Sequence, residues 1–154
     1  MGDKIGRLRH SFLCAIRGVL YCIANERNLR IHITAALYVS VFAALGEIEP
    51  PGCALLALCF GVMLSAELMN TAIERLGDRA SPEFDRLVRD AKDVAAGGVL
   101  VCALACVAAG YMLFIPTGAL ALALHALFDK IWRLMLLILS IPAALLFIFY
   151  AGRA

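Results

Sequence analysis

Four long stretches of the sequence carry no Asp, Glu, Lys or Arg, and they constrain the fold more than any other feature. They cover residues 31–46, 50–66, 94–128 and 134–152. Inside a bilayer every backbone N–H and C=O must be bonded within the protein, so an apolar stretch crosses it as a helix. A crossing takes roughly 20 residues at about 1.5 Å each, so the two shorter stretches must extend into their flanks. The pattern predicts an all-α membrane protein.

The bounds of the expected transmembrane helices follow from turn residues and from the positions where charged residues occur again. We expect three transmembrane helices over residues 29–46, 51–75 and 91–115, and a fourth over residues 132–150. The apolar stretch between the third and fourth helices, after the turn at 116–118, is interpreted as too short for another crossing.

A further helix is expected before the first span, over residues 4–25. Its apolar residues recur at helical spacing, as Ile5, Leu8, Phe12 and Ile16 illustrate, and arginines occupy polar positions between them. Such a pattern is typical of an amphipathic helix lying in the membrane surface.

The basic residues indicate which side of the membrane each end faces. Six Lys or Arg precede the first charge-free stretch at residue 31 and five lie from position 75 to position 92, whereas the turn at 46–51 has none. The positive-inside rule therefore predicts a protein of the inner membrane whose N-terminus and 75–92 loop are cytoplasmic. Lys130 and Arg133 fall on the outer side, against the rule. A net charge of +2 is too small to indicate a nucleic-acid partner.

The six cysteines show no metal-binding or redox spacing. None forms a C-x-x-C pair or clusters with histidine, and all lie in apolar surroundings. We interpret them as small packing residues.

Glu67 is the residue that most strongly indicates chemistry. A carboxylate within a span is costly and faces protein or water, so it is a functional candidate by default. Seven residues of an α-helix advance two turns less about 20°, so Glu67 and Glu74 share a face, with Asn70 close to it and Asp78 continuing the line. The sequence therefore predicts a polar stripe that begins in the bilayer and ends at the cytoplasmic surface.

Two other charged clusters are expected on the same side of the membrane. Glu26 and Arg30 lie in the segment before the first span, and Lys92 and Asp93 open the third. Each charged residue has an ordinary alternative role. Glu26 and Arg30 are four residues apart, the spacing of an ion pair on a helix surface. Lys92 can be a snorkelling anchor, and Glu74 can belong to a solvated helix end.

Carboxylates, an amide and a lysine together have the chemistry of a phosphate-handling site. Two carboxylates are enough to hold Mg²⁺ on a nucleotide, a lysine binds phosphate, and a base takes the acceptor's proton. No Walker A, protein-kinase glycine loop or D-F-G motif is present. The residues alone predict a polar site at the cytoplasmic membrane face and leave its reaction open.

Four motifs in order make the chain similar to a known family, the small prokaryotic diacylglycerol and undecaprenol kinases. The resemblance covers about residues 7–110 and rests on ERNLRIH (26–32), AELMNTAIE (66–74), D-R-x-SPEF (78–84) and AKDVAAGGVL (91–100). It implies a homotrimer of three-span subunits with active sites shared between neighbours. It also implies a lipid kinase domain over residues 1–115 and leaves 116–154 as a C-terminal extension.

The resemblance implies a role for each matching residue. Glu67 becomes the catalytic base for the hydroxyl of a membrane lipid, undecaprenol being favoured over diacylglycerol, and Asn70 steadies the reacting groups. Glu26 and Glu74 become the ligands of the Mg²⁺ that bridges the ATP phosphates. The remaining nucleotide-binding positions are Arg7, Glu83, Lys92 and Asp93. Asp85 stands where the family commonly has His.

A second function remains open on charge placement alone. A small four-span transporter or channel subunit can use a glutamate within a span, such as Glu67, as a proton or cation site. Such a protein has no need of the acidic stripe's cytoplasmic end or of the Lys92–Asp93 pair.

Overall fold

The computed structural model describes residues 2–81, 83 and 85–151, and within them the chain is entirely helical. The side chains of residues 2 and 3 lie outside this description. The helices are α1 (Gly2–Asn25), α2 (Arg27–Leu45), α3 (Pro50–Ala80), α4 (Arg86–Phe114), α5 (Ala119–Phe128) and α6 (Ile131–Tyr150). The prediction of an all-α fold is confirmed.

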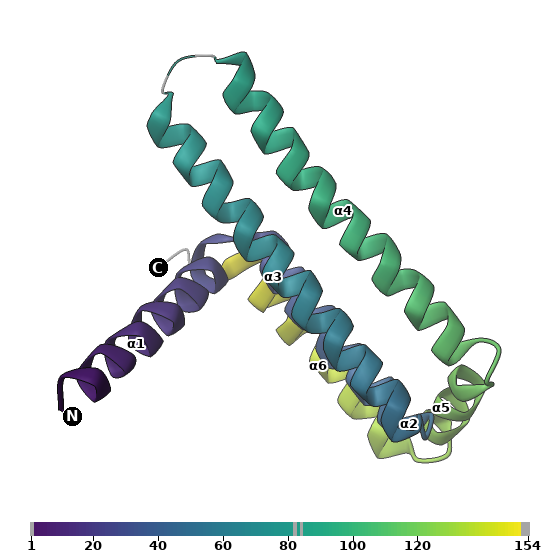
Figure 1. Ribbon diagram of the computed structural model, residues 1–154. Coiled ribbons are helices and arrows are strands. Elements are labelled where there is room, and N and C mark those ends of the chain that lie inside the picture. Colours follow the sequence, from purple (N-terminus) through teal and green to yellow (C-terminus); the bar gives the residue numbers. More distant parts are fainter. Residues whose placement is uncertain (1, 82, 84, 152–154) are drawn as a thin grey trace.

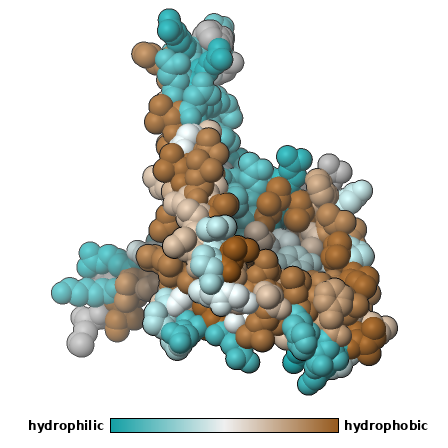
Figure 2. All heavy atoms as spheres, turned by 90° about the vertical axis from the view of Figure 1, so that its right-hand side faces the viewer, coloured by the Kyte–Doolittle hydropathy of each residue, from teal (hydrophilic) through white to brown (hydrophobic). Residues whose placement is uncertain are grey.

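Four of these helices, α2, α3, α4 and α6, are long and apolar enough to cross a membrane. They coincide with the three expected spans and with the fourth. Few of their residues are buried within the chain, and α4 and α6 bury none. Figure 2 shows the resulting surface: apolar side chains cover the middle of the molecule, and hydrophilic ones gather at the tip of the α3–α4 hairpin and at the opposite end.

The helices α3 and α4 run past the boundaries predicted for them. α3 continues to Ala80, and α4 begins at Arg86. The two pack tightly outside the apolar region, where a Cβ on Gly77 would meet the side chains of Lys92 and Val88 at 2.8 and 2.9 Å. Close packing of this kind stabilises the helices where the bilayer no longer does.

Asp85 has a structural role in that hairpin. It is the N-cap of α4, and its Oδ1 accepts hydrogen bonds from the backbone N–H of Leu87 at 2.8 Å and of Val88 at 3.3 Å. A capping carboxylate satisfies amides that have no partner within the helix.

Removing the Asp85 cap should therefore destabilise the hairpin. We expect Asp85→Ala to lower the free energy of unfolding by about 1 kcal/mol and Asp85→Asn, which keeps a capping oxygen, to have a much smaller effect. Denaturant titration in detergent followed by circular dichroism measures both. Equal loss in the two variants would contradict a capping role.

The short helix α5 lies beside the C-terminal end of α2. Its ten residues are too few to cross a bilayer, as expected from the sequence. It starts after Gly118, whose φ of 76° allows the chain to reverse. A Cβ on Gly46 would lie 2.6 Å from the carbonyl oxygen of Ala119, so the close approach of α2 and α5 requires glycine there.

In Figure 1, α1 projects sideways from the bundle, across the direction of α2 and α3. α2 contacts α3, α5 and α6, and α6 returns along α2 so that its C-terminal end lies beside the junction of α1 and α2. All six cysteines are free. Burial, and next the charge of Glu26, raise the pKa of the Cys22 thiol, which keeps this residue in the neutral form suited to packing.

Candidate active site

Glu26 occupies the single residue that separates α1 from α2. Its backbone is extended, with φ −107° and ψ 114°, so the helix axis changes direction there and Glu26 becomes the N-cap position of α2. We call residues 25–27 the elbow. The turn before it ends with the Asn25 side-chain amide donating to the Tyr21 carbonyl at 2.8 Å.

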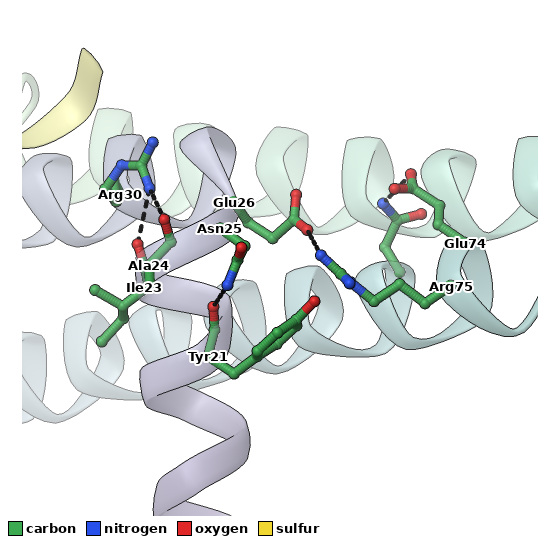
Figure 3. A network of polar contacts seen from close by, with 9 residues as sticks. Tyr21, Ile23, Ala24, Asn25, Glu26, Arg30, Glu74 and Arg75 are labelled. Atoms are coloured by element: carbon green, nitrogen blue, oxygen red, sulfur yellow. Dashed lines mark hydrogen bonds and ion pairs between the residues drawn. The ribbon is translucent and has the colours of Figure 1, made fainter. Parts of the chain in front are cut away.

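The Glu26 side chain faces α3 across the elbow. One carboxylate oxygen lies 3.5 Å from a guanidinium nitrogen of Arg75, and the Arg75 guanidinium lies 4.3 Å from the centroid of the Tyr21 ring (Figure 3). The charge and the aromatic face together hold Arg75 in place. The first helix, the elbow and α3 are thus joined at one point.

The polar stripe on α3 lies as its spacing predicted. Glu67 is 3% exposed and Asn70 is 8% exposed. The Asn70 amide nitrogen donates to the Glu74 carboxylate at 2.7 Å. Asn28 lies within hydrogen-bonding reach of the Glu67 carboxylate, and His32 is close enough to interact with its charge. The stripe is therefore a network of neighbouring polar groups in which Asn70 and Glu74 are directly hydrogen-bonded.

One atom in this network has no partner within the described residues. The Asn70 side-chain oxygen is buried and accepts no hydrogen bond. A buried acceptor left unpaired costs about 1–3 kcal/mol, so such an atom is a natural place for a ligand's donor. It lies between Glu67 and Glu74 along the stripe.

At its C-terminal end, near Glu74 and Asp78, the stripe opens into a hollow of about 450 Å³ next to the elbow. We call it the elbow hollow. Lys92 of α4 binds Asp78 at its border and so brings a third cation beside Arg75 and Arg79. The hollow is lined by Glu26, Glu74, Arg75, Asp78 and Arg79.

Three predicted site residues lie elsewhere in the chain. Arg7 is on α1, about 27 Å from that helix's end at 1.5 Å per residue. Glu83 is exposed in the loop between α3 and α4, and its backbone carbonyl accepts from Ser81 at 2.8 Å. Asp93 is exposed on α4 and pairs with Arg89 at 3.8 Å. Within one chain the structure does not bring these three to the elbow hollow.

The ordinary alternatives for Glu26 and for Glu74 are not what the structure contains. Glu26 pairs with Arg75, whereas the Arg30 guanidinium binds backbone carbonyls, so an ion pair between Glu26 and Arg30 is wrong. Glu74 is half-buried and bonded to Asn70 instead of being a solvated helix end. Lys92 reaches Asp78.

Sequence reasoning did not single out Arg75, Tyr21, Asn28 or His32 as site residues. The last two stand in the ERNLRIH segment, whose clustered polar residues before a span were a signal for them. Nothing in the sequence indicates that Arg75 and Tyr21 meet, because their contact depends on the angle at the elbow.

Burial of the stripe does not require a neighbouring subunit. Glu67, Asn70 and Thr71 are all buried by the single chain. The cost of exposing these groups to lipid is therefore avoided within one chain.

The residues of the elbow hollow suit a magnesium ion that is held partly by phosphate. Among the described residues no three His, Cys, Asp or Glu side chains come together in a group able to hold a metal ion. Mg²⁺, however, commonly takes one or two protein carboxylates and completes its shell with phosphate oxygens and water. Glu26 and Glu74 provide two carboxylates on one hollow, and the unpaired Asn70 oxygen provides a further neutral acceptor nearby.

Comparison with known proteins shows which family the sequence resembles. The family model for prokaryotic diacylglycerol kinase matches residues 13–114. A diacylglycerol kinase of Synechocystis sp. is 39% identical over 107 residues, which are 69% of this chain and 61% of that protein. An undecaprenol kinase of Bacillus subtilis is 35% identical over 114 residues, 74% of this chain and 93% of that protein. This chain thus spans about three fifths of the Synechocystis relative. No solved structure matches the chain.

Proposed function

This chain belongs to the prokaryotic diacylglycerol kinase family, and we propose that it transfers the γ-phosphate of ATP to the hydroxyl of a membrane lipid. The observation that carries the proposal is the stripe formed by the buried Glu67 and Asn70 and the half-buried Glu74, which leads to the elbow hollow. It provides a base at membrane depth and carboxylates at the surface, as phosphoryl transfer from a soluble nucleotide to a lipid requires.

The proposed roles follow the position of each group. Glu67 takes the proton of the lipid hydroxyl as its oxygen attacks the γ-phosphorus, the bond from that phosphorus to the β-phosphate oxygen breaks, and ADP leaves. Asn70, whose side-chain oxygen is a buried unpaired acceptor, steadies the reacting groups. Glu26 and Glu74 hold the metal ion, which would neutralise charge on the ATP phosphates when bound. Arg75 and Lys92 lie at or beside the hollow and supply positive charge to the phosphate oxygens.

We assign the kinase domain to residues 1–115 and the extension to residues 116–154. The proposed location is the inner membrane, with α1 in the cytoplasmic surface and the elbow hollow open to the cytoplasm. Large apolar side chains exposed along α1 support this placement, among them Ile5, Leu8, Phe12 and Ile16. The basic residues near the hollow support the orientation.

We also propose that the protein is a homotrimer with shared sites. The support is the family, together with the distance between the elbow hollow and Arg7, Glu83 and Asp93 in one chain. If these three residues contact the nucleotide, they do so at the elbow hollow of a neighbouring subunit.

Subunit mixing tests the shared site. Trimers that combine Glu67→Gln subunits with Asp93→Ala subunits should regain part of the activity that each pure variant lacks, because some sites then receive both intact residues. Phosphorylation of lipid by affinity-purified mixed oligomers measures the recovery. Absence of recovery in verified mixed trimers would place both residues in the same chain.

The substrate is proposed to be undecaprenol in preference to diacylglycerol, since the ERNLRIH and NTAIE segments resemble that branch of the family. The test offers each lipid in separate mixed micelles to the purified protein with γ-labelled ATP. We expect faster labelling of undecaprenol. Labelling of diacylglycerol alone would overturn the preference, and no labelling of either lipid would contradict the kinase proposal.

A further inference from the structure

Arg30 is a buried cation at which two helix ends meet. Its side chain is 6% exposed. One guanidinium nitrogen donates to the carbonyls of Ile23 at 2.8 Å and Ala24 at 3.0 Å, and the Nε donates to the carbonyl of Ile148 at 3.0 Å (Figure 3 shows the contacts to α1).

These three acceptors belong to the last turns of α1 and α6. Carbonyls in the last turn of a helix have no partner within that helix, and the helix dipole places partial negative charge there. A single guanidinium therefore satisfies orphan carbonyls of two helices and neutralises both ends.

Other contacts hold α6 against α2 on the same side. The Arg27 guanidinium lies 5.9 Å from the centroid of the Phe149 ring, close to the Arg30 contact. Farther along, the hydroxyls of Tyr38 and Ser140 are hydrogen-bonded at 2.9 Å. The C-terminal end of α6 is thus held beside the elbow by Arg27 and Arg30. These two residues lie on either side of Leu29, which is 2% exposed.

We propose that Arg30 is a positioning residue that anchors the elbow to the C-terminal end of α6 and so holds Glu26 opposite Glu74. The inference rests on the proposed function for the role of Glu26. The inference also assigns a structural role to the C-terminal extension. The helix α6 lies outside residues 13–114, which match the family model. Its last turn nevertheless accepts a hydrogen bond from Arg30, which lies within those residues.

The first test measures the geometry without any activity. Nitroxide labels attached through Leu20→Cys on α1 and Leu76→Cys on α3, both exposed positions, report the distance across the elbow by pulsed electron resonance in a background without native cysteines. We expect a narrow distribution in the parent protein and a broad one after Arg30→Met or after ending the chain at Leu146, which removes the Ile148 carbonyl. Tyr38→Phe, on the same interface but away from the elbow, should leave the distribution narrow.

The second test is a double-mutant cycle on the Mg²⁺ concentration that gives half-maximal lipid phosphorylation. The chain ended at Leu146 should raise it about tenfold, the effect of losing one charge-assisted bond, and Arg30→Met, which loses all three bonds, should raise it by at least as much. Turnover at saturating Mg²⁺ should stay near that of the parent. The combined variant should be no worse than the more affected single one, because both remove the same contact.

Several results would overturn the inference. An unchanged distance distribution in both variants would do so, as would unaltered Mg²⁺ dependence or strictly additive effects. If Arg30→Met does not fold, the shortened chain carries both measurements, since Arg30 keeps two of its three bonds there. If the parent protein phosphorylates no lipid, the proposed function fails, while the distance measurement still decides whether α6 anchors the elbow.

Discussion

Replacing Glu67 by glutamine should reduce lipid phosphorylation by about 10²- to 10⁴-fold, the range that general-base catalysis contributes. Glutamine keeps the size of the side chain and its contacts with Asn28, but it does not accept a proton at neutral pH. Binding of ATP with Mg²⁺ should persist, because the elbow hollow is lined by other residues. Initial rates of label transfer and equilibrium nucleotide binding measure the two effects separately.

The matched control is Glu49→Gln, at the opposite end of the molecule, where the carboxylate is exposed. It should leave turnover unchanged. A Glu67→Gln protein that retains near-normal turnover would exclude Glu67 as the base. Loss of nucleotide binding together with turnover would instead indicate that Glu67 maintains the structure of the hollow.

Glu26→Ala and Glu74→Ala should each raise the Mg²⁺ requirement for ATP binding by at least about tenfold, as losses around a metal site commonly do. Excess Mg²⁺ should restore part of the activity, because water can replace one lost carboxylate in the ion's shell. Glu26→Ala also releases Arg75 from its 3.5 Å contact, whereas Glu74→Ala removes the partner of the Asn70 amide. Metal titrations of ATP binding distinguish the two variants.

Asp90→Ala is the control for this pair, since Asp90 is an exposed carboxylate on α4 that pairs with Arg86 at 4.0 Å. Its Mg²⁺ requirement should equal that of the parent. If either Glu26→Ala or Glu74→Ala keeps the parent's metal dependence, that residue is not a ligand.

The spans were predictable from sequence because they depend on a local property, the absence of charge over a bilayer's thickness. The ends of the helices were not predictable in this way. The helices α3 and α4 continue beyond the apolar region because they pack closely at Gly77 and because Asp85 caps α4. The stripe of Glu67, Asn70 and Glu74 was predictable for a similar reason: one helix fixes the relative direction of its own side chains.

Contacts between helices were beyond sequence reasoning. The i,i+4 spacing of Glu26 and Arg30 indicates an ion pair only when both residues stand in one continuous helix. Glu26 is extended at the elbow, so its side chain turns toward Arg75 and leaves Arg30 to the carbonyls of α1 and α6. Burial of the stripe within one chain likewise depends on how the elbow and α3 pack, which no spacing rule provides.

The most direct test of the kinase proposal is the coupling between ATP consumption and lipid phosphorylation in the purified protein. ADP release and labelled lipid are followed together, with and without a lipid alcohol in the micelles. The proposal predicts one phosphorylated lipid for each ATP consumed, and negligible ATP consumption without the alcohol. ATP-independent proton or cation flux through reconstituted vesicles that is lost in Glu67→Gln, with no labelled lipid formed, would contradict it and favour a transporter.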